Sequence, residues 1–262
     1  MDFDTLTYVV RDGVARITLN RPHAGNALDL QMSKDLMYAA LAADEDPSVR
    51  AVVLGANGKL FCAGGDLGAF HDAGDRRPAL IKEMTTYLHA GISRMARMAA
   101  PVVASVHGAA AGAGMSLVCA ADLVLCGESA KFAMAYTAAG LTPDGGSTYS
   151  LPRLLGTRRT LELMLTNRRI DATTALEWGL VTQVVPDEDL AATTDALAAR
   201  LASGATAALG SAKRLVLGSF DRSLESQMEL ESRAISDAAR TADAAEGIAA
   251  FLEKRPPKFT GR

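Results

Sequence analysis

Two glycine-rich segments have the composition needed to turn backbone amides toward a ligand. The first is Phe61–Leu67, with adjacent glycines at Gly64 and Gly65, and the second is Gly108–Ser116. Glycine has no Cβ to block a ligand, and a helix start leaves unpaired N–H groups at the positive end of its dipole. Alone, the first segment is more often an ordinary loop, and the second is balanced between tight packing and ligand binding. Together they favour a site for an anionic group.

A single carboxylate, Asp144, lies in a third segment, Leu141–Tyr149. Pro143-Asp144-Gly145 is also good turn chemistry, so a surface turn is the competing interpretation. One carboxylate is suited to shuttling a proton, because it takes a proton from one carbon and returns it to another. The residues of this segment alone leave both interpretations open.

Strands alternating with helices must position these segments. Buried strands are predicted at Ala51–Gly55 and Val102–Val106, ahead of the two glycine-rich segments. The alternation predicts an α/β fold with a mostly parallel sheet. The other expected elements are a hairpin of Thr7–Arg11 and Val14–Asn20, helices at Asp29–Ala43, Ala79–Met98, Gly112–Ala121 and Ala172–Glu177, a strand at Asp122–Cys126, and a loop at Ala56–Gly68.

The pattern changes beyond Asp187, where only helices are expected. We therefore divide the chain into a core at residues 1–200 and a C-terminal helical region at residues 201–262. These Ala-rich helices carry more apolar surface than one small bundle needs, which favours packing on a neighbouring subunit. The expected helices are Asp187–Ala202, Thr206–Leu217, Leu224–Ala239 and Ala242–Leu252.

Composition and charge argue against several other classes of protein. The chain has 262 residues, 49% hydrophobic and 22% charged, which is ordinary for a globular protein. Its net charge of −3 means that the chain lacks the overall positive charge typical of nucleic-acid-binding proteins. Neither glycine-rich segment reads GxGxxG or GxxxxGK[ST], so dinucleotide and nucleoside-triphosphate binding lack support.

Two further features of the sequence bear on where in the cell the protein is expected. The cysteines Cys62, Cys119 and Cys126 have no CxxC spacing, so a disulfide framework or a zinc site is not expected and a reducing cytoplasm fits best. The mostly apolar run Met98–Asp122 is interrupted by Pro101 and several glycines. A buried strand, a tight loop and a buried helix explain it better than a membrane span.

In combination, these segments resemble the crotonase (enoyl-CoA hydratase/isomerase) superfamily, in the correct order along essentially the whole chain. That order makes the resemblance far more specific than any single motif. The matching segments are Asn20–Pro22, Asn26–Leu28, Phe61–Leu67, Pro101–Ser116, Gly140–Gly146, Leu151–Arg153, Ala175–Val181 and Phe251–Arg255.

The resemblance implies a spiral of ββα turns with a C-terminal helical trimerisation region, assembled as a trimer or a dimer of trimers. It implies CoA thioester substrates and no metal or redox cofactor. The amides of Gly65 and Ala113 match the pair that binds the thioester oxygen, although the family usually has glycine where Ala113 stands. The substrate-binding positions that we carry over or add are Arg21, Ala24, Ala63, Gly64, Asp66, Leu67, Gly68, His89, Ser116 and Tyr136.

The branch of the family depends on three positions. Hydratases similar to this chain carry two glutamates that activate water, at the positions of Ser116 and Tyr136. A serine hydroxyl or a phenol is a poor base near neutral pH, so efficient hydration is not expected. The segment around Asp144 resembles an isomerase branch in which an aspartate there is the acid/base, and this resemblance favours the acid/base role of Asp144 over a surface turn.

Two alternatives stay open. The chain is also similar to 4-chlorobenzoyl-CoA dehalogenase, which uses an aspartate nucleophile at the position of Asp144 and a histidine at that of His89, but has tryptophan where Tyr136 stands. His89 is otherwise a polar packing residue. The other alternative is a catalytically degenerate acyl-CoA-binding protein, which Ser116 and Tyr136 keep open.

Overall fold

The computed structural model describes residues 2–261 and begins with the expected hairpin. Strands β1 (Leu6–Arg11) and β2 (Val14–Leu19) pair antiparallel through the turn at Asp12 and Gly13. The following strands add in parallel in the order β1-β2-β3-β4-β6-β9. Their bounds are Ala51–Ala56 for β3, Val102–Val106 for β4, Leu123–Gly127 for β6 and Gln183–Val185 for β9.

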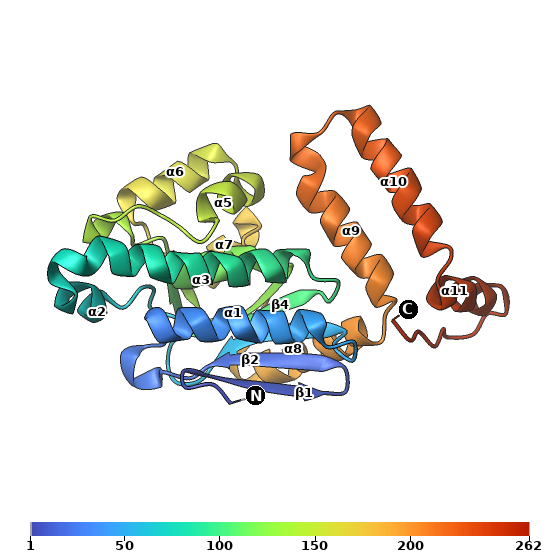
Figure 1. Ribbon diagram of the computed structural model, residues 1–262, viewed down its shortest axis with the longest axis horizontal. Coiled ribbons are helices and arrows are strands. Elements are labelled where there is room, and N and C mark those ends of the chain that lie inside the picture. The colour runs from blue at the N-terminus through green and yellow to red at the C-terminus, as the bar shows by residue number, and fades with distance from the viewer. Residues whose placement is uncertain (1, 262) are drawn as a thin grey trace.

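Helices cover both faces of this six-stranded sheet (Figure 1). Helices α1 (Leu30–Glu45) and α3 (Arg77–Arg97) run side by side over one face, and α8 (Leu190–Ala202) covers the other. Along β3, Val52 and Leu54 enter the main core while Ala51 and Val53 pack with α8. Successive side chains on a strand point to opposite faces, so burial on both sides explains the continuous apolar runs.

A second, smaller sheet was not predicted from the sequence. Its strands are β5 (Ala109–Ala111), β7 (Lys131–Ala133) and β8 (Ile170–Asp171), in the order β5-β7-β8. It carries the chain from β4 into α4 (Ala113–Ala120), where the sequence predicted only a loop entering a helix at Gly112. The predicted loop Ala56–Gly68 starts on the last residue of β3 and runs two residues too far, because α2 (Leu67–Asp72) begins at Leu67.

Three helices follow the strand β7 along the chain, two before β8 of the small sheet and one between β8 and β9 of the main sheet. Helix α7 (Ala172–Trp178) matches the predicted segment to within one residue. The other two, α5 (Ser147–Leu155) and α6 (Thr157–Thr166), were not predicted. Asp144 lies three residues before the first residue of α5, so the segment that could have been a surface turn leads into a helix.

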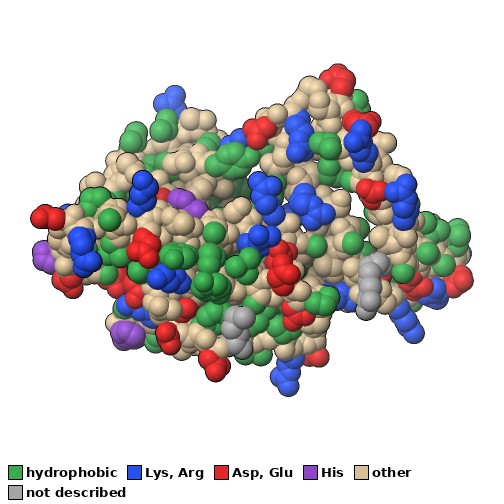
Figure 2. All heavy atoms as spheres, viewed as in Figure 1, with side chains coloured by type: hydrophobic (Ala, Val, Ile, Leu, Met, Phe, Trp, Pro, Cys, Tyr) green, Lys and Arg blue, Asp and Glu red, His purple; other side chains and the backbone are tan. Residues whose placement is uncertain are grey.

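The C-terminal helices stand away from the core (Figure 1). They are α9 (Thr206–Gly218), α10 (Leu224–Ala238) and α11 (Ala242–Leu252). No residue of α10 is buried, and hydrophobic side chains gather over the outer end of α11 (Figure 2). The large exposed apolar side chains of this region are Val216, Leu217, Phe220, Leu224, Met228, Ile235, Ile248, Phe251 and Leu252.

One ion pair fixes the start of this region to the core. The Lys213 ammonium on α9 lies 2.6 Å from Asp122 Oδ2 and donates to the carbonyl of Met95 at 2.6 Å. The same carboxylate accepts from the Val102 amide at 2.7 Å. Burial lowers the pKa of Lys213 and raises that of Asp122, which means that desolvation opposes both charges and each depends on the other.

We expect Lys213→Met to lower the free energy of unfolding by roughly 3–5 kcal/mol, because it leaves the Asp122 carboxylate half-buried without its cation. The double variant Lys213→Met/Asp122→Asn should recover part of that loss, since asparagine carries no charge. Chemical denaturation measures both, with Lys82→Met at an exposed position as the control. A change in Lys213→Met within about 0.5 kcal/mol of the wild type, as at an ordinary surface position, would contradict this account.

Candidate active site

A cavity of about 300 Å³ lies where the two glycine-rich segments meet. Helix α3 and the segment that leads to Asp144 form its other walls. The lining is mostly apolar, and Asp144 is the only ionisable carboxylate among the described residues that form it. The lining residues are Leu28, Ser33, Ala63, Gly64, Gly65, Leu67, Phe70, Ile81, Met84, Thr85, Leu88, Gly112, Ala113, Ala135, Tyr136, Ala139, Leu141, Thr142 and Asp144.

Two backbone amides that line this cavity have no acceptor among residues 2–261. Leu28 pairs with Gly65 as a parallel bridge: the Leu28 amide donates to Gly64 at 2.7 Å, and the Asp66 amide donates to Leu28 at 2.8 Å. The donors of this bridge are the amides of Leu28 and Asp66, and the N–H of Gly65 takes no part in it. Ala113 is the first residue of α4, where an amide has no partner within the helix. Both N–H groups are available to an oxygen in the cavity.

Glycine is required where the two segments touch. Gly64 has φ +111°, and a Cβ there would lie 3.1 Å from the carbonyl oxygen of Ala111. Gly112 has φ +51° and ψ −124°, a conformation that residues with a Cβ rarely adopt. The strand pair Cys62–Ala110 holds the segments in register beside them. These contacts place Gly65 and Ala113 on the same cavity.

Both oxygens of the Asp144 carboxylate are in contact with a side chain. The Tyr136 hydroxyl donates to Oδ1 at 2.5 Å, and His89 Nε2 lies 3.2 Å from Oδ2. The Asp144 side chain is 25% exposed. Burial and the neighbouring Asp144 carboxylate raise the pKa of Tyr136 well above its ordinary value, so the phenol keeps its proton and stays a donor.

Ser116 completes this network from behind the cavity wall. Its side chain is fully buried; Oγ lies 2.9 Å from the Tyr136 hydroxyl and donates to the Asp144 carbonyl at 3.0 Å. Ala135, which precedes Tyr136 in the chain, has φ +49°, an unfavourable conformation for a residue with a Cβ. It lies at the point where Tyr136 enters the cavity. Ser116 and Tyr136 therefore brace Asp144 and present no second carboxylate.

Several residues predicted to bind substrate lie elsewhere. The Arg21 guanidinium is 3.2 Å from both Asp29 and Asp66, and it donates to the carbonyl of Ala27 at 2.6 Å. Its charge is thus neutralised within the chain. Asp66 caps α2 by accepting from the Ala69 amide at 3.1 Å. Four more predicted residues, Ala24, Gly68, His89 and Ser116, are also outside the cavity lining.

Helix α3 supplies much of the apolar wall of the cavity. Ile81, Met84, Thr85 and Leu88 lie on one face of α3 and line the cavity. Their spacing of three, one and three residues is the signal of a helix face, but such a stripe equally predicts core packing. Only tertiary structure separates the two, because both environments are apolar.

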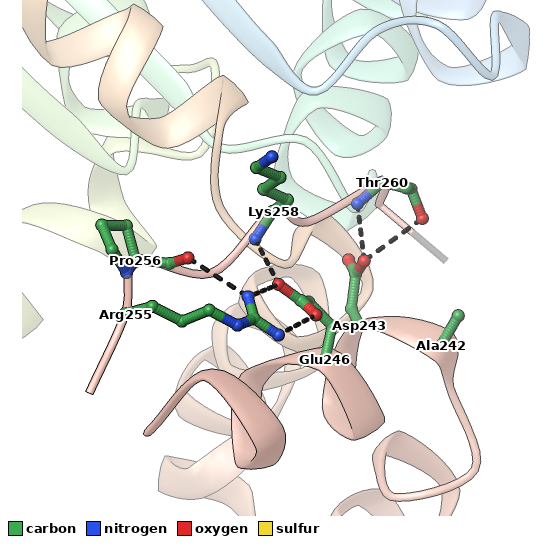
Figure 3. Close-up of a pocket in the computed structure, with 7 residues that line it drawn as sticks. All are labelled: Ala242, Asp243, Glu246, Arg255, Pro256, Lys258 and Thr260. Carbon is green, nitrogen blue, oxygen red and sulfur yellow. Dashed lines mark hydrogen bonds and ion pairs between the residues drawn. The ribbon is translucent and has the colours of Figure 1, made fainter. Parts of the chain in front are cut away.

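A second cavity lies between α11 and the C-terminal tail (Figure 3). The Glu246 carboxylate accepts hydrogen bonds from the Arg255 guanidinium at 2.6 and 2.9 Å and from the Lys258 amide at 2.8 Å. The hydrogen bonds from Arg255 hold the pKa of Glu246 down at about 2. Asp243 accepts from the Thr260 amide at 2.6 Å. These acids fasten the tail and are not free for chemistry.

Among residues 2–261, no three His, Cys, Asp or Glu side chains gather as a metal ion would require. None of the helices within that range is long and apolar enough to cross a membrane.

An α/β fold with two unpaired amides and one carboxylate around an apolar cavity is the arrangement of an enzyme that stabilises an oxyanion. The family model described as enoyl-CoA hydratase/isomerase matches residues 10–262. The chain therefore belongs to the enoyl-CoA hydratase/isomerase family, as the resemblance predicted.

Relatives from three organisms illustrate the match. A "Probable enoyl-CoA hydratase" of Rhodobacter capsulatus is 39% identical over the full length of both chains. The 1,2-epoxyphenylacetyl-CoA isomerase of Escherichia coli is 38% identical over 97% of each. A crystal structure from Mycobacterium abscessus, titled as an enoyl-CoA hydratase/isomerase, superposes with a TM-score of 0.93 at 39% identity, covering 98% of this chain and 100% of its own. The fold prediction is confirmed, and the relatives carry both hydratase and isomerase names.

Proposed function

We propose that the protein is an enoyl-CoA isomerase that moves a carbon–carbon double bond with Asp144 as the acid/base. The observation that carries this proposal is the lone carboxylate of the cavity. Hydration needs a group to activate water as well as a proton donor, whereas double-bond migration needs one group that removes and returns the same kind of proton. Asp144 meets the second requirement alone.

The proposed reaction starts from a 3-enoyl-CoA thioester. The amides of Gly65 and Ala113 donate to the thioester oxygen, and Asp144 takes a proton from C2. The electron pair moves into a dienolate whose negative oxygen the two amides stabilise more than the carbonyl of the substrate. Asp144 then gives a proton to C4, and a 2-enoyl-CoA leaves. The steps need no group beyond the chain itself, so we propose that coenzyme A enters only as part of the substrate.

Slow hydration is part of the same proposal. Ser116 and Tyr136 stand where hydratases similar to this chain carry glutamates, and both hydroxyls are occupied by each other and by Asp144. A phenol that keeps its proton cannot act as a base toward water.

The experiment compares two substrates on the wild-type protein. We expect it to convert a 3-enoyl-CoA into the 2-enoyl isomer much faster than it hydrates the 2-enoyl-CoA, with products identified by chromatography. The reverse order of rates would make the protein a hydratase. Tight binding of acyl-CoA with neither reaction, and no exchange of the α-proton in deuterated water, would favour a degenerate binding protein.

A second candidate is aspartyl-ester chemistry on an aroyl-CoA, as in the dehalogenase that the chain resembles. The contact between His89 Nε2 and Asp144 Oδ2 favours it, because a histidine there could activate water for hydrolysis of an ester. A single turnover in oxygen-18 water decides, since an aspartyl ester first delivers an enzyme oxygen to the product. Fully labelled product in the first turnover would exclude it.

We also propose that the chain assembles as a trimer or a dimer of trimers. The supporting observation is α10, a helix of 15 residues with no buried residue and with Met228 and Ile235 exposed. Such apolar side chains are usually covered by a partner. Light scattering should give three or six times the mass of the chain. The three buried free cysteines support a reducing compartment, which we propose is the cytoplasm.

A further inference from the structure

His89 connects the Asp144 carboxylate with solvent. It lies on α3 one residue after Leu88, which lines the cavity, but His89 itself is outside that lining. Its Nε2 is 3.2 Å from Asp144 Oδ2, and its side chain is 49% exposed against 25% for Asp144. The imidazole thus contacts the carboxylate on one side and water on the other.

The hydrogen bonds around His89 define which ring nitrogen carries the proton. The Gly145 amide donates to Nε2 at 3.1 Å. An amide N–H can only donate, so Nε2 presents a lone pair and the proton of the neutral ring is on Nδ1. Within residues 2–261, Nδ1 has no hydrogen-bond partner. A protonated Asp144 Oδ2 can donate to Nε2, whereas an ionised Oδ2 faces a lone pair.

The two oxygens of Asp144 are therefore not equivalent. Oδ1 already accepts a hydrogen bond of 2.5 Å from Tyr136, whose raised pKa keeps the phenol protonated. Oδ2 has no donor while His89 is neutral, so it is the oxygen free to take a proton. A proton removed from substrate then lies next to Nε2 of His89.

We propose that His89 relays protons between Asp144 and solvent, an inference that rests on the proposed isomerase function. The C2–H bond breaks, its electron pair enters the dienolate, and the proton binds Oδ2. Oδ2 passes that proton to Nε2, which leaves a carboxylate and an imidazolium. A protonated Nε2 no longer accepts from the Gly145 amide, so the half-exposed ring turns toward water and its Nε2 proton exchanges there. Return of a proton from Nε2 to Oδ2 restores the acid, which protonates C4. The proton that reaches C4 is then partly a solvent proton.

The test follows the transferred hydrogen. A 3-enoyl-CoA carrying deuterium at C2 is isomerised in ordinary water, and the fraction of deuterium found at C4 is measured by mass spectrometry. We expect low retention in the wild type and several-fold higher retention in His89→Ala, because the base that takes the proton from Oδ2 is missing. His71→Ala is the matched control, since His71 is an exposed helix histidine that the site does not use.

Two further arms separate a relay from a structural role. In His89→Gln an amide oxygen can accept from Gly145 but cannot carry a proton, so retention should stay high even if the loop is held. Added imidazole should lower retention in His89→Ala toward the wild-type value and leave His71→Ala unchanged. Wild-type retention in both His89 variants would overturn the relay, as would high retention in the wild type.

Failure of the relay is distinct from failure of the proposed function. If the wild type moves no double bond, isomerase activity is refuted. The relay is then tested on a saturated acyl-CoA in deuterated water, where His89→Ala should slow exchange of the α-proton several-fold and imidazole should restore it. No α-exchange in the wild type would overturn the relay as well, because Asp144 would then remove no proton.

Discussion

The Asp144→Asn variant is expected to lose isomerase activity by about 10³-fold in kcat, within the range for removing a general acid/base. Asparagine has nearly the same shape, and its amide oxygen can still accept the Tyr136 hydroxyl that now donates at 2.5 Å. The cavity and its two free amides are retained. Acyl-CoA should therefore bind with nearly unchanged affinity, so kcat falls while the dissociation constant does not.

Stopped-flow or steady-state rates with a 3-enoyl-CoA measure kcat. Calorimetric titration with a product 2-enoyl-CoA measures the dissociation constant separately. Asp72→Asn is the matched control, because Asp72 is an exposed acid at the end of α2. Equal isomerisation rates in Asp144→Asn and the wild type would remove Asp144 from the mechanism. Loss of binding together with rate would instead point to a damaged cavity.

The Ala113→Pro variant is expected to lower kcat by roughly 10²–10³-fold, or about 2.7–4 kcal/mol of transition-state stabilisation, the usual effect of deleting one oxyanion donor. Proline has no N–H, and it directs a ring carbon toward the place where the amide pointed. The first position of a helix tolerates proline, and Ala113 occupies that position in α4. The preceding Gly112 has the conformational freedom that a residue before proline needs.

Folding must be shown to survive this change. Circular dichroism and the midpoint of chemical denaturation should be close to those of the wild type, because the Ala113 amide has no acceptor within residues 2–261. Ala242→Pro, at the exposed first position of α11, is the control for an alanine-to-proline change at a helix start. An unchanged kcat in a well-folded Ala113→Pro protein would mean that this amide does not bind the thioester oxygen.

The sequence by itself determined the family and five of the six strands of the main sheet, whereas β9 was not predicted. The runs at Val102–Val106 and in β3 are apolar because both faces are buried, so local composition predicts the strands. Asp29 predicts the start of α1, since a carboxylate there caps the Met32 amide. The sequence also showed that Asp144 is present and that serine stands at position 116 where hydratases carry glutamate. These facts depend on residue type and order along the chain, and not on distances between atoms.

Tertiary structure decided how these residues act. Strands of two or three residues, as in β5, β7 and β8, are too short to show a period, and only pairing between segments far apart creates them. Arg21 was expected to bind substrate, yet it forms an ion pair with Asp66, a residue 45 positions away in the sequence. The contact of His89 with Asp144 spans 55 positions. Such distances are fixed by packing of the whole chain, which no local pattern records, and they decide which side chains surround the lone carboxylate.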